Sequence, residues 1–591
     1  MSKVIIYDFE IFRLDSLLGA NIIDESGRSS IYQTWDLGEM KVFYQNHQND
    51  LWIGHNNYDY DDKILDAIVH DEDPFVTSQK IVSKTYTTKK RIKLYSIDLM
   101  RLKSDTYSLK LTELLCGKNI HTTEVDFMIK RKLTDEEKEK TERYNRSDLI
   151  QTAYNYNMMF DLIKLRLDII KEFKLDFKKS LDLPGYILAA NILNAKYTPS
   201  LKYSHVEPIR CEQLQIKNKE VLNYYYSKNY LTSEGYSFEM NGIKLTLGGG
   251  GIHGALNKYN VEKVLYIDVK GYYNLLSILY NLFPRNLSDD AKAKYKHMYE
   301  TQLELKKTNP VKRELYKVIL LAITGSMKLD NSPFYDPEMY ALLTCLGQLF
   351  IIDLLEKVEP YTRFIQANTD GIMLEPYDWN NETTIVSIVN EWINRTGFEV
   401  KIEHLYNLWQ RDVNTYCCFD ENNNVIYKGD VLKNYDIGDR AYASQSFFKC
   451  KEPPIIAQGI INFLLYDIEP EVFIRDNKTN LKLFQYACSK GGFDYTTYDT
   501  KNYITMEHTS ERLQGIDRVF AFKSNEISGM VYKHKSRYGK VTQSKYPSIP
   551  ENVFVYNGAL NEVSEDFYSK IDYQYYVNRI YQKIRDFVGE I

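Results

Sequence analysis

The first 165 residues alternate between short apolar runs and longer amphipathic stretches. Residues 3–7, 51–54 and 91–97 are short and apolar and predict strands. A helix is predicted at 61–69, and a long helical stretch at 135–165. Strands and helices that alternate in this way are typical of an α/β domain.

The middle of the chain has a weaker pattern. Residues 166–245 are mixed and carry no sharp motif. They are followed by LGGGGIHG at 247–254, the strongest interruption of the pattern in the chain. We interpret these glycines as a hinge or boundary between two functional halves.

Beyond the glycines, the pattern predicts a helical region framed by strands. The predicted elements are strands at 261–269, 363–367 and 372–375 and helices at 289–323 and 337–358. The last two strands flank a tight Asn-Thr-Asp-Gly turn. After about residue 425 the pattern is mixed again.

Composition and charge indicate a globular protein of several subdomains. A chain of 591 residues is too long for one core, so we expect about three to five subdomains. Hydrophobic residues make up 44% and charged residues 26%, as in soluble proteins. Because the net charge is only −5, a nucleic-acid site must be a local basic surface.

The cysteines and the apolar segments indicate a cytoplasmic protein. The seven cysteines contain no C-x-x-C pair, which argues against structural zinc and suits a reducing compartment. The N-terminus lacks the pattern of a signal peptide. Residues 339–355 are the most apolar stretch, but Thr344, Gln348 and Asp353 interrupt it, which favours a buried helix over a membrane span.

A first set of acidic residues lies in the N-terminal α/β region. Alternation along a strand places Asp8 and Glu10 on one face. Asp61 starts a predicted helix, and Tyr144 and Asp148 lie four residues apart on another. Two-metal phosphodiester hydrolysis uses carboxylates around two ions roughly 4 Å apart, and a phenol can orient the attacking water. Taken singly, Asp61 and Asp148 are better explained as ordinary helix-cap or surface acids.

A second set follows the glycines. Asp268 ends an apolar strand, where a buried charge is costly without a partner. Asp370 lies in the tight turn, and together the two could form another two-metal site. Between them, Arg313 and Lys317 are four apart on a helix and could grip a triphosphate, although a solvated helix face explains them equally well.

The order of these motifs resembles that of family B DNA polymerases, in particular the small phage-encoded enzymes with an N-terminal exonuclease. YDFE at 7–10 is similar to the first exonuclease motif. Asn56 through Asp61 is similar to the second, with Asp61 chosen from the acidic run 59–62. Tyr144 to Asp148 matches the third, Y-x-x-x-D.

The resemblance continues in the second half. DVKGYY at 268–273 is similar to motif A, which implies that Asp268 is a metal ligand and that Tyr273 excludes a ribose 2′-hydroxyl. Lys317 and Gly325 resemble motif B. The motif B residues Asn, Ser and Tyr are replaced by Leu321, Ala322 and Thr324, which puts base-pair checking in question.

Two further motifs depart from the family at one position each. NTD at 368–370 resembles the D-T-D of motif C, with Asn368 in place of the first Asp and Asp370 as the implied ligand. Tyr416 matches the tyrosine of the K-x-Y segment near the primer terminus. Its lysine is replaced by Asn414, for which the nearby Arg411 is a candidate substitute.

The resemblance implies an α/β and α+β multidomain fold, an RNase H-like exonuclease domain followed by a right-hand polymerase. The implied domains are an exonuclease (1–165), a connecting region (166–245), a palm (246–284 and 336–430), fingers (285–335), and a thumb with the C-terminal region (431–591). The glycines at 247–254 stand where the family has a short link between exonuclease and polymerase.

The implied site residues fall into three groups. The metal ligands are Asp8, Glu10, Asp61, Asp148, Asp268 and Asp370, with Tyr144 and Lys317 as the other catalytic residues. The nucleotide-binding residues are Tyr273, Arg313 and Lys317. The DNA-binding residues are Asn56, Tyr416, Lys428, Lys535, Arg537 and Lys540. The last three belong to a basic strip (Lys533, Lys535, Arg537, Lys540, Lys545) that also fits a solvated loop.

The resemblance also implies cofactors and partners. They are two Mg²⁺ ions per active site, for which Mn²⁺ can substitute, with primer–template DNA, dNTPs and phage replication accessory proteins. We expect a monomer that does not bind membranes and lies in the cytoplasm of the phage's host. The short intervals 268–317 and 317–370 leave little room for the insertions of the protein-primed branch, so we expect ordinary primers.

The predicted activity is template-directed DNA synthesis with 3′→5′ proofreading, in the service of a phage genome. Three alternatives stay open: an exonuclease whose polymerase half has decayed, a nucleic-acid-binding scaffold without activity, and an enzyme that synthesises RNA. Tyr273 argues against the last of these.

Overall fold

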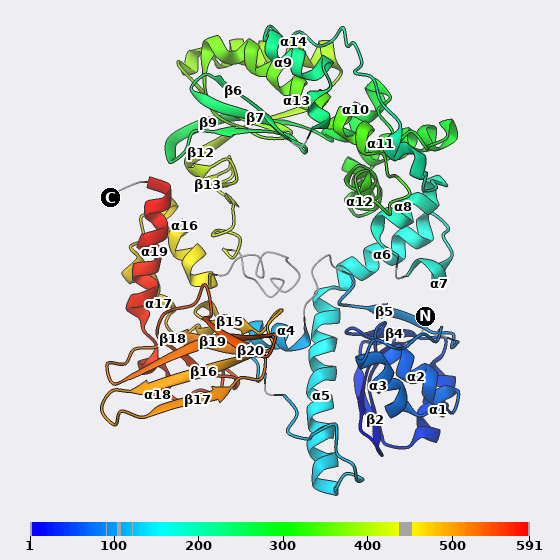
Figure 1. The fold of residues 1–591 in the computed structure, drawn as a ribbon. Helices are drawn as coiled ribbons and strands as arrows, with labels where there is room; N and C mark the ends of the chain where they lie inside the picture. Colours follow the sequence, from blue (N-terminus) through cyan, green and yellow to red (C-terminus); the bar gives the residue numbers. More distant parts are fainter. Residues whose placement is uncertain are drawn as a thin grey trace.

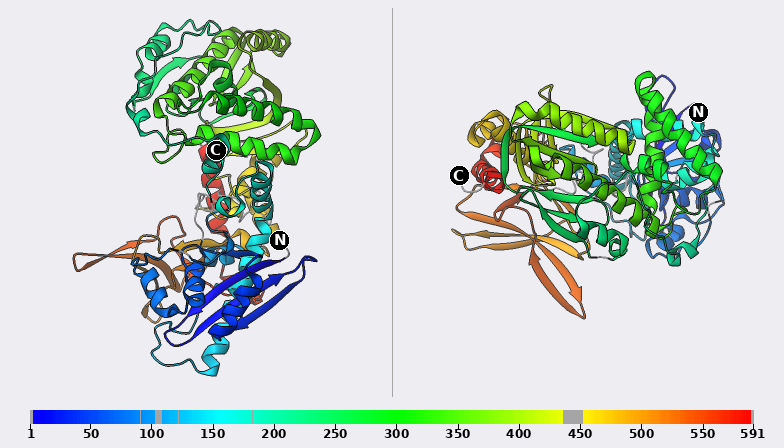
Figure 2. Two further views of the ribbon diagram at one scale, coloured as in Figure 1. Left: turned by 90° about the vertical axis from the view of Figure 1, so that its right-hand side faces the viewer. Right: turned by 90° about the horizontal axis from the view of Figure 1, so that it is seen from above.

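A computed structural model describes residues 3–89, 91–102, 108–120, 122–181, 183–232, 234–435 and 452–588. The bodies of the chain are arranged around a ring (Figure 1). An N-terminal α/β body lies at the lower right, a large sheet with its helices at the top, and a C-terminal body at the lower left. Two helical columns join them, one containing α5 and α6 and the other α16 and α19; Figure 2 gives two further views.

The N-terminal body is a five-stranded sheet with helices on both faces. Its strands are β1 (Val4–Ile11), β2 (Ser16–Ile23), β3 (Ser29–Thr34), β4 (Leu51–Gly54) and β5 (Tyr95–Asp98), in the order β3-β2-β1-β4-β5. β1 is antiparallel to β2 and parallel to β4. The α/β prediction is confirmed, although β2 and β3 were missed and β5 begins later than the predicted strand at 91–97.

The helices of this body divide between the two faces of the sheet. Ile5 and Tyr7 of β1 pack into the core that includes Met40 and Ile64, whereas Ile6 packs with Leu149 on the other face. The first face is covered by α1 (Leu37–His47) and α2 (Asp61–Val69), with α3 (Pro74–Val82) packed on α2, and the second by α5 (Asp135–Met158). The even positions of β1 therefore face α5.

The long predicted helix at 135–165 is two helices. A capping box of Thr134 and Glu137 starts α5. Met159, with φ −98° and ψ 5°, ends it, and α6 (Phe160–Glu172) follows. The helices α7 (Phe177–Ser180), α8 (Gly185–Leu193) and α9 (Lys219–Tyr226) lead to the large sheet.

The large sheet has nine strands in the order β14-β13-β12-β9-β11-β10-β8-β7-β6. Its strands are β6 (Tyr236–Met240), β7 (Ile243–Leu247), β8 (Ile252–Ala255), β9 (Tyr259–Val269), β10 (Thr362–Ala367), β11 (Gly371–Pro376), β12 (Val400–Asp412), β13 (Thr415–Phe419) and β14 (Val425–Lys428). The strands predicted at 261–269, 363–367 and 372–375 are confirmed as parts of β9, β10 and β11. Helices α10 (Tyr272–Tyr280), α13 (Pro337–Val358) and α14 (Glu382–Thr396) share one core with it.

The glycine-rich segment is a turn inside this sheet rather than a hinge. It joins β7 to β8, which pair with each other, and the predicted boundary at 245/246 falls within β7. A Cβ at Gly251 would overlap the side chain of Thr369, so glycine lets the turn approach the loop between β10 and β11 closely.

The helical region predicted at 289–323 is also two helices. Asn309 has non-helical backbone angles (φ −153°, ψ 83°) and separates α11 (Asp289–Thr308) from α12 (Pro310–Ser326). The side chain of Asn309 accepts a hydrogen bond from the amide of Lys312, and Pro310 suits the first helical position. The two helices pack against each other and on α8.

Helix α13 matches its predicted bounds and lies in the core. Residues Pro337–Tyr361 are long and apolar enough to cross a membrane, but 83% of their 18-residue apolar window, whose mean hydropathy is 1.5, is buried inside the protein. The carboxylate of Asp353 forms ion pairs with Lys357 and Arg395, both at 2.8 Å. The prediction of a buried helix is confirmed.

The C-terminal body combines two small sheets with helices. One sheet has the order β15-β18-β21 and the other β17-β16-β19-β20. The elements are α16 (Pro454–Tyr466), α17 (Pro470–Asn477), β15 (Tyr486–Ser489), β16 (Tyr495–Asn502), β17 (His508–Arg512), β18 (Ile516–Ala521), β19 (Ile527–Arg537), β20 (Lys540–Lys545), β21 (Val553–Val555), α18 (Glu565–Lys570) and α19 (Tyr573–Val588). Phe484, Phe520 and Tyr576 lie at the centre of its core.

Candidate carboxylate sites

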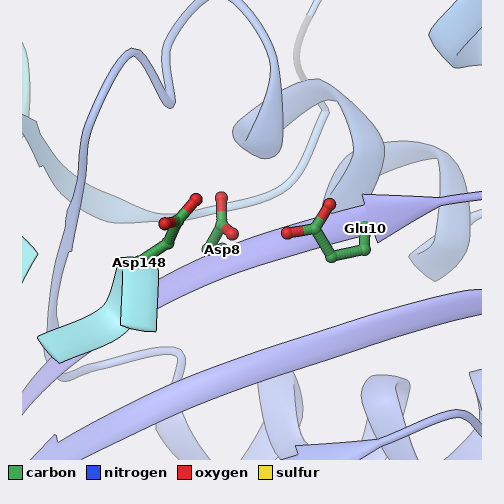
Figure 3. Close-up of side chains that lie close together, drawn as sticks. All are labelled: Asp8, Glu10 and Asp148. Carbon is green, nitrogen blue, oxygen red and sulfur yellow. The ribbon is translucent and has the colours of Figure 1, made fainter. Parts of the chain in front are cut away.

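Three carboxylates converge in the N-terminal body. Asp8 and Glu10 come from β1 and Asp148 from α5, and one oxygen of each lies within 4.8 Å of the others (Figure 3). Asn145 of α5 donates to Asp8 at 3.1 Å. A Cβ at Gly19, the β2 partner of Asp8, would overlap Asn145, so this glycine lets α5 approach the sheet.

The acidic run at 59–62 separates into three roles. Asp61 is buried, accepts a hydrogen bond from the amide of Phe9 at 3.1 Å, and lies close enough to Asp8 for that charge to raise its pKa. Asp62 instead accepts hydrogen bonds from Tyr7 and Ser96 inside the body. Asp59 pairs with an arginine at the surface. Of the three, Asp61 is the acid that lies beside the cluster.

Burial and mutual repulsion hold these carboxyls at high pKa. Burial, followed by the charge of Asp148, raises the pKa of Asp8 to about 7. Burial and the charge of Asp8 raise the pKa of Glu10 well above its usual value. Burial also raises the pKa of Asp148, and Lys110 opposes that shift. Because like charges crowd here, a bound cation would be strongly favoured.

Lys110 is a site residue that the sequence analysis missed. Its Nζ lies 2.8 Å from Asp148 and 3.1 Å from Glu113, and it stands over the ring of Tyr144 at 4.5 Å. Lys110 lies in the first turn of α4 (Leu109–Leu115), a helix too short to give a periodic signal. Only the tertiary contact between α4 and α5 reveals its role.

The other two predicted exonuclease residues are Tyr144 and Asn56. Tyr144 is on the same face of α5 as Asp148, and burial together with the charges of Asp148 and Glu10 raises its pKa. Asn56 has left-handed backbone (φ 68°), and its amide donates to Asp98 at 2.8 Å. That contact fixes the loop that leads from β4 to Asp61.

In the large sheet, Asp268 and Asp370 meet across two neighbouring strands. Gly371, the residue after Asp370, pairs with Asp268, and the amide of Val269 donates to the main-chain oxygen of Asp370 at 2.7 Å. The side chain of Asn368 accepts from the amide of Thr369 at 2.8 Å. Asn368, the departure from D-T-D, therefore stabilises the turn itself.

This pair is more open than the N-terminal cluster. Asp268 is partly buried and Asp370 is exposed. Desolvation raises the pKa of both, with a further contribution to Asp268 from the charge of Asp370. The charge of Lys428 lowers the pKa of Asp370, and the hydroxyl of Tyr266 lies 3.3 Å from Asp268. The pKa of Tyr416 is raised to about 12, chiefly by burial, and the charges of both carboxylates contribute to this shift.

Tyr273 lies between these carboxylates and the glycine-rich turn. It is in the first turn of α10, and its hydroxyl donates to the main-chain oxygen of Gly250 at 2.7 Å. The side-chain amide of Gln348 in α13 donates to the main-chain oxygen of Gly248 in the same turn at 2.6 Å. The charge of Asp370 contributes to the raised pKa of Tyr273, after burial and Tyr340. The turn and the tyrosine therefore line the same site.

The two predicted triphosphate cations share a face of α12 but contact neither carboxylate. Lys317 pairs with Glu314 at 3.2 Å. The Nε of Arg313 is buried and has no hydrogen-bond partner among the described residues. The structure therefore leaves these cations apart from the carboxylate pair.

The basic strip divides between two faces of a hairpin. The pairing of β19 with β20 places Arg537 opposite Lys540 and Tyr532 opposite Lys545. Since side chains alternate, Lys533, Lys535, Arg537 and Lys540 share one face, and Lys545 lies on the other. One face of the hairpin therefore carries four of the five cations of the predicted strip. All of β20 is exposed.

Comparisons with known proteins add a similarity of fold. No protein-family model matches the chain, and no similar sequence was found among curated proteins. The family B DNA polymerase from the hyperthermophilic archaeon Pyrobaculum calidifontis is similar in structure over 100% of this chain and 78% of that one, with a TM-score of 0.44 and 11% sequence identity. This similarity is too low to assign a family.

Proposed function

We propose that the protein is a DNA-dependent DNA polymerase with an intrinsic 3′→5′ exonuclease, built as an RNase H-like domain followed by palm, fingers and thumb. One observation carries the proposal. The chain assembles two separate carboxylate sites, Asp8, Glu10 and Asp148 in one body and Asp268 and Asp370 in another (Figures 1 and 3). The members of each site come from segments far apart in the sequence.

The residues present fit divalent metal ions. Carboxylate oxygens are the preferred ligands of Mg²⁺ and of Mn²⁺. The crowding that raises the pKa of Asp8 and Glu10 is the condition that a cation relieves. When bound, such ions activate an attacking oxygen and stabilise the charge of the phosphoryl transition state. Asp61 would complete the exonuclease ligands.

In the exonuclease, the other residues would orient the attacking water and offset negative charge. Tyr144 is placed to orient water beside Asp148, and its raised pKa keeps the phenol protonated. Lys110 offsets the charge of Asp148 and would add a cation beside the phosphate to be cleaved. Asn56 stabilises the loop that carries Asp61 and would contact the single strand.

In the polymerase, substrate binding would use both the sheet and α12. Tyr273 packs beside the glycine-rich turn, where it would exclude a 2′-hydroxyl. Lys317 and Arg313 would bind the triphosphate after α12 approaches the sheet. Lys428 and Tyr416 lie beside Asp370, where a primer terminus would be held.

Primer extension tests the polymerase. The wild type is expected to extend a labelled primer on a DNA template with dNTPs and Mg²⁺, and Asp268→Ala and Asp370→Ala are expected to lose this activity. Retained synthesis in Asp370→Ala would show that the turn at 368–371 is not motif C. Incorporation of rNTPs at the rate of dNTPs would favour RNA synthesis instead.

A second candidate is an exonuclease whose polymerase half is inactive. Two observations favour it, Asn368 in place of an acid and the separation of Lys317 from Asp370. Degradation of single-stranded DNA without primer extension by the wild type would establish this candidate. Degradation that disappears in Asp8→Ala and Glu10→Ala variants excludes a scaffold without activity.

The proposal extends to the biological setting predicted from the sequence. We infer a monomeric enzyme that extends ordinary primers and replicates a phage genome in the host cytoplasm, together with accessory proteins. Support comes from the motif order and from the short helical pair α11–α12 between the two palm carboxylates. Extension from a free oligonucleotide primer, without a protein primer, tests the first point.

A further inference from the structure

A buried arginine joins the C-terminal body to the N-terminal one. Arg518 of β18 is 0% exposed, and its guanidinium donates to Gln485 at 2.9 Å and to the main-chain oxygen of Gly558 at 2.6 Å, both in its own body. It also donates to the main-chain oxygens of Leu114 at 3.1 Å and Lys118 at 2.8 Å. These two residues lie about 400 positions earlier in the chain, at and after the end of α4.

The charge of Arg518 suits this position. Burying a guanidinium costs several kcal/mol unless its donors are satisfied, and here they bond to carbonyl and amide oxygens. Desolvation lowers its pKa to about 10, so it stays charged at neutral pH. The oxygen of Leu114 belongs to the last turn of α4, where a positive charge is favourable.

The segment that follows α4 is bound to the same body. The amide of Ile120 donates to Asn557 at 2.9 Å, and the amide of Leu560 donates to Gly117 at 2.8 Å. Gln514 donates to the main-chain oxygen of Ile120 at 2.8 Å. The apolar contacts are made by Leu114, Leu115, Ile120, Ala487 and Ile516. Figure 1 shows α4 beside the strands of the C-terminal body.

The other end of α4 reaches the exonuclease carboxylates. Lys110, in the first turn, contacts Asp148, Glu113 and the ring of Tyr144. A helix of seven residues is about 10 Å long. A single short helix therefore connects Arg518 to Asp148, and a shift at one end displaces the other.

We propose that the C-terminal body positions Lys110 in the exonuclease site, with Arg518 as the positioning residue that fixes α4. The inference rests on the proposed exonuclease activity. Arg518 touches neither the carboxylates nor DNA, so it acts only through α4. Hydrolysis in the N-terminal body thus depends on its contact with the C-terminal body, and movement between the two bodies would weaken proofreading without any change at Asp8, Glu10 or Asp148.

A double-mutant cycle in the full-length protein separates positioning from a general structural role. The variants are Arg518→Met, Arg518→Lys and Lys110→Gln, alone and combined, assayed on 5′-labelled single-stranded DNA with Mg²⁺. We expect Arg518→Met to slow degradation about 100-fold, as a misplacement of roughly 1 Å can. Arg518→Lys keeps the charge and part of the bonding, so about a tenfold loss is expected. In the Lys110→Gln background, the Arg518 substitutions should slow degradation by less than about twofold.

Hydrogen exchange gives a readout that does not depend on catalysis. Arg518→Met should speed exchange of the amides of residues 109–120 and leave strand β1 unchanged. Val531→Ala is the matched control, because Val531 is equally buried in the C-terminal core and belongs to another cluster than α4. It should leave both degradation and exchange in 109–120 within about twofold of the wild type.

Distinct results overturn the inference and the proposed function. Three results would each overturn the positioning role of Arg518. The first is that the losses of degradation rate add in the double-mutant cycle, and the second is an equal loss in Val531→Ala. The third is unchanged hydrogen exchange of the amides of residues 109–120 in Arg518→Met. If the wild type does not degrade DNA, the exonuclease proposal fails, and the inference falls with it. If the wild type degrades DNA and Arg518→Met does so equally well, only the inference fails.

Discussion

The two carboxylate sites of this chain differ in how completely they are assembled. The N-terminal site has three converging carboxyls, a fourth beside them, and its own cation in Lys110. The site in the large sheet has two carboxylates, one of them exposed, and its predicted triphosphate cations contact neither. Under the proposed function, the first site would bind the end of a flexible strand and can be built in advance, whereas the second would select a nucleotide and so must admit it first and close afterwards.

The geometry of the supporting backbone explains this difference. Asp8 and Glu10 are fixed by a central strand, and α5 is brought against them at Gly19. Asp370 lies in a turn between two central strands of its sheet, and Lys317 is on a helix whose packing partners include α8 and α11. The first arrangement brings its carboxyls together through a strand and a closely packed helix, and the second leaves α12 free of direct bonds to the carboxylate pair among the described residues.

The largest expected effect is a crossed loss of activity. Asp8→Ala should reduce DNA degradation about 1000-fold and leave primer extension intact, because metal coordination contributes several kcal/mol to the transition state. Asp268→Ala should do the reverse. Both reactions are measured on the same preparations by gel electrophoresis of labelled strands. If either change abolishes both activities, the chain has one site and the comparison fails.

The second prediction concerns stability without metal. Because the pKa of Asp8 is about 7 in the folded protein against 3.8 for a free carboxyl, its contribution is favourable at low pH and is lost as the pH rises from about 4 to about 7. In EDTA at pH 8, Asp8→Asn should therefore be more stable than the wild type by about 2–4 kcal/mol. Thermal unfolding against pH measures this difference.

Metal supplies the control for that measurement. Saturating Mg²⁺ should stabilise the wild type at pH 8 and should stabilise Asp8→Asn much less. The corresponding change at Asp370 should have a smaller effect, since Asp370 is exposed. Equal pH profiles for wild type and Asp8→Asn in EDTA would contradict the crowding that distinguishes the N-terminal site.

The third prediction tests whether α12 completes the second site. Lys317→Ala should lower kcat/KM for dNTP about tenfold to 100-fold, because a hydrogen bond to a charged group contributes about 1.5–3 kcal/mol. DNA degradation should be unchanged. Lys312→Ala is the matched control, because Lys312 of the same helix pairs with Glu172 at 3.0 Å. A loss in the control equal to that in Lys317→Ala would remove α12 from the nucleotide site.

Much of the fold follows from local patterns, and the errors have local causes. The bounds of β4, α2 and α13 match the predictions. An apolar run marks β4, and the side chain of Asp336 caps the start of α13. Residues 135–165 and 289–323 were each read as one helix because polar periodicity continues across Met159 and Asn309. The period is averaged over many positions, so it does not reveal one residue whose backbone departs from the helical conformation.

The candidate sites show the same limit at longer range. The spacing of Asp8, Glu10, Tyr144 and Asp148 could be recognised because each motif is short. Lys110 and Arg518 could not, since their roles come from contacts with residues 38 and about 400 positions away. The glycines at 247–254 were misread as a hinge because a hairpin turn and a linker share the same composition.

The smallest expected effect concerns the basic face of the β19–β20 hairpin, where Lys540 faces Arg537. Lys540→Ala should weaken primer–template binding about twofold to fivefold and reduce the salt dependence of binding by about one ion, as for a single phosphate contact. Single-strand degradation should not change, because we assign this face to the duplex. Lys545→Ala, on the opposite face, is the matched control and should leave both quantities unaltered. Fluorescence anisotropy with a labelled primer–template between low and high salt measures the slope. If Lys540→Ala slows single-strand degradation as much as it weakens duplex binding, the hairpin serves both sites, and their separation is less complete than the carboxylates indicate.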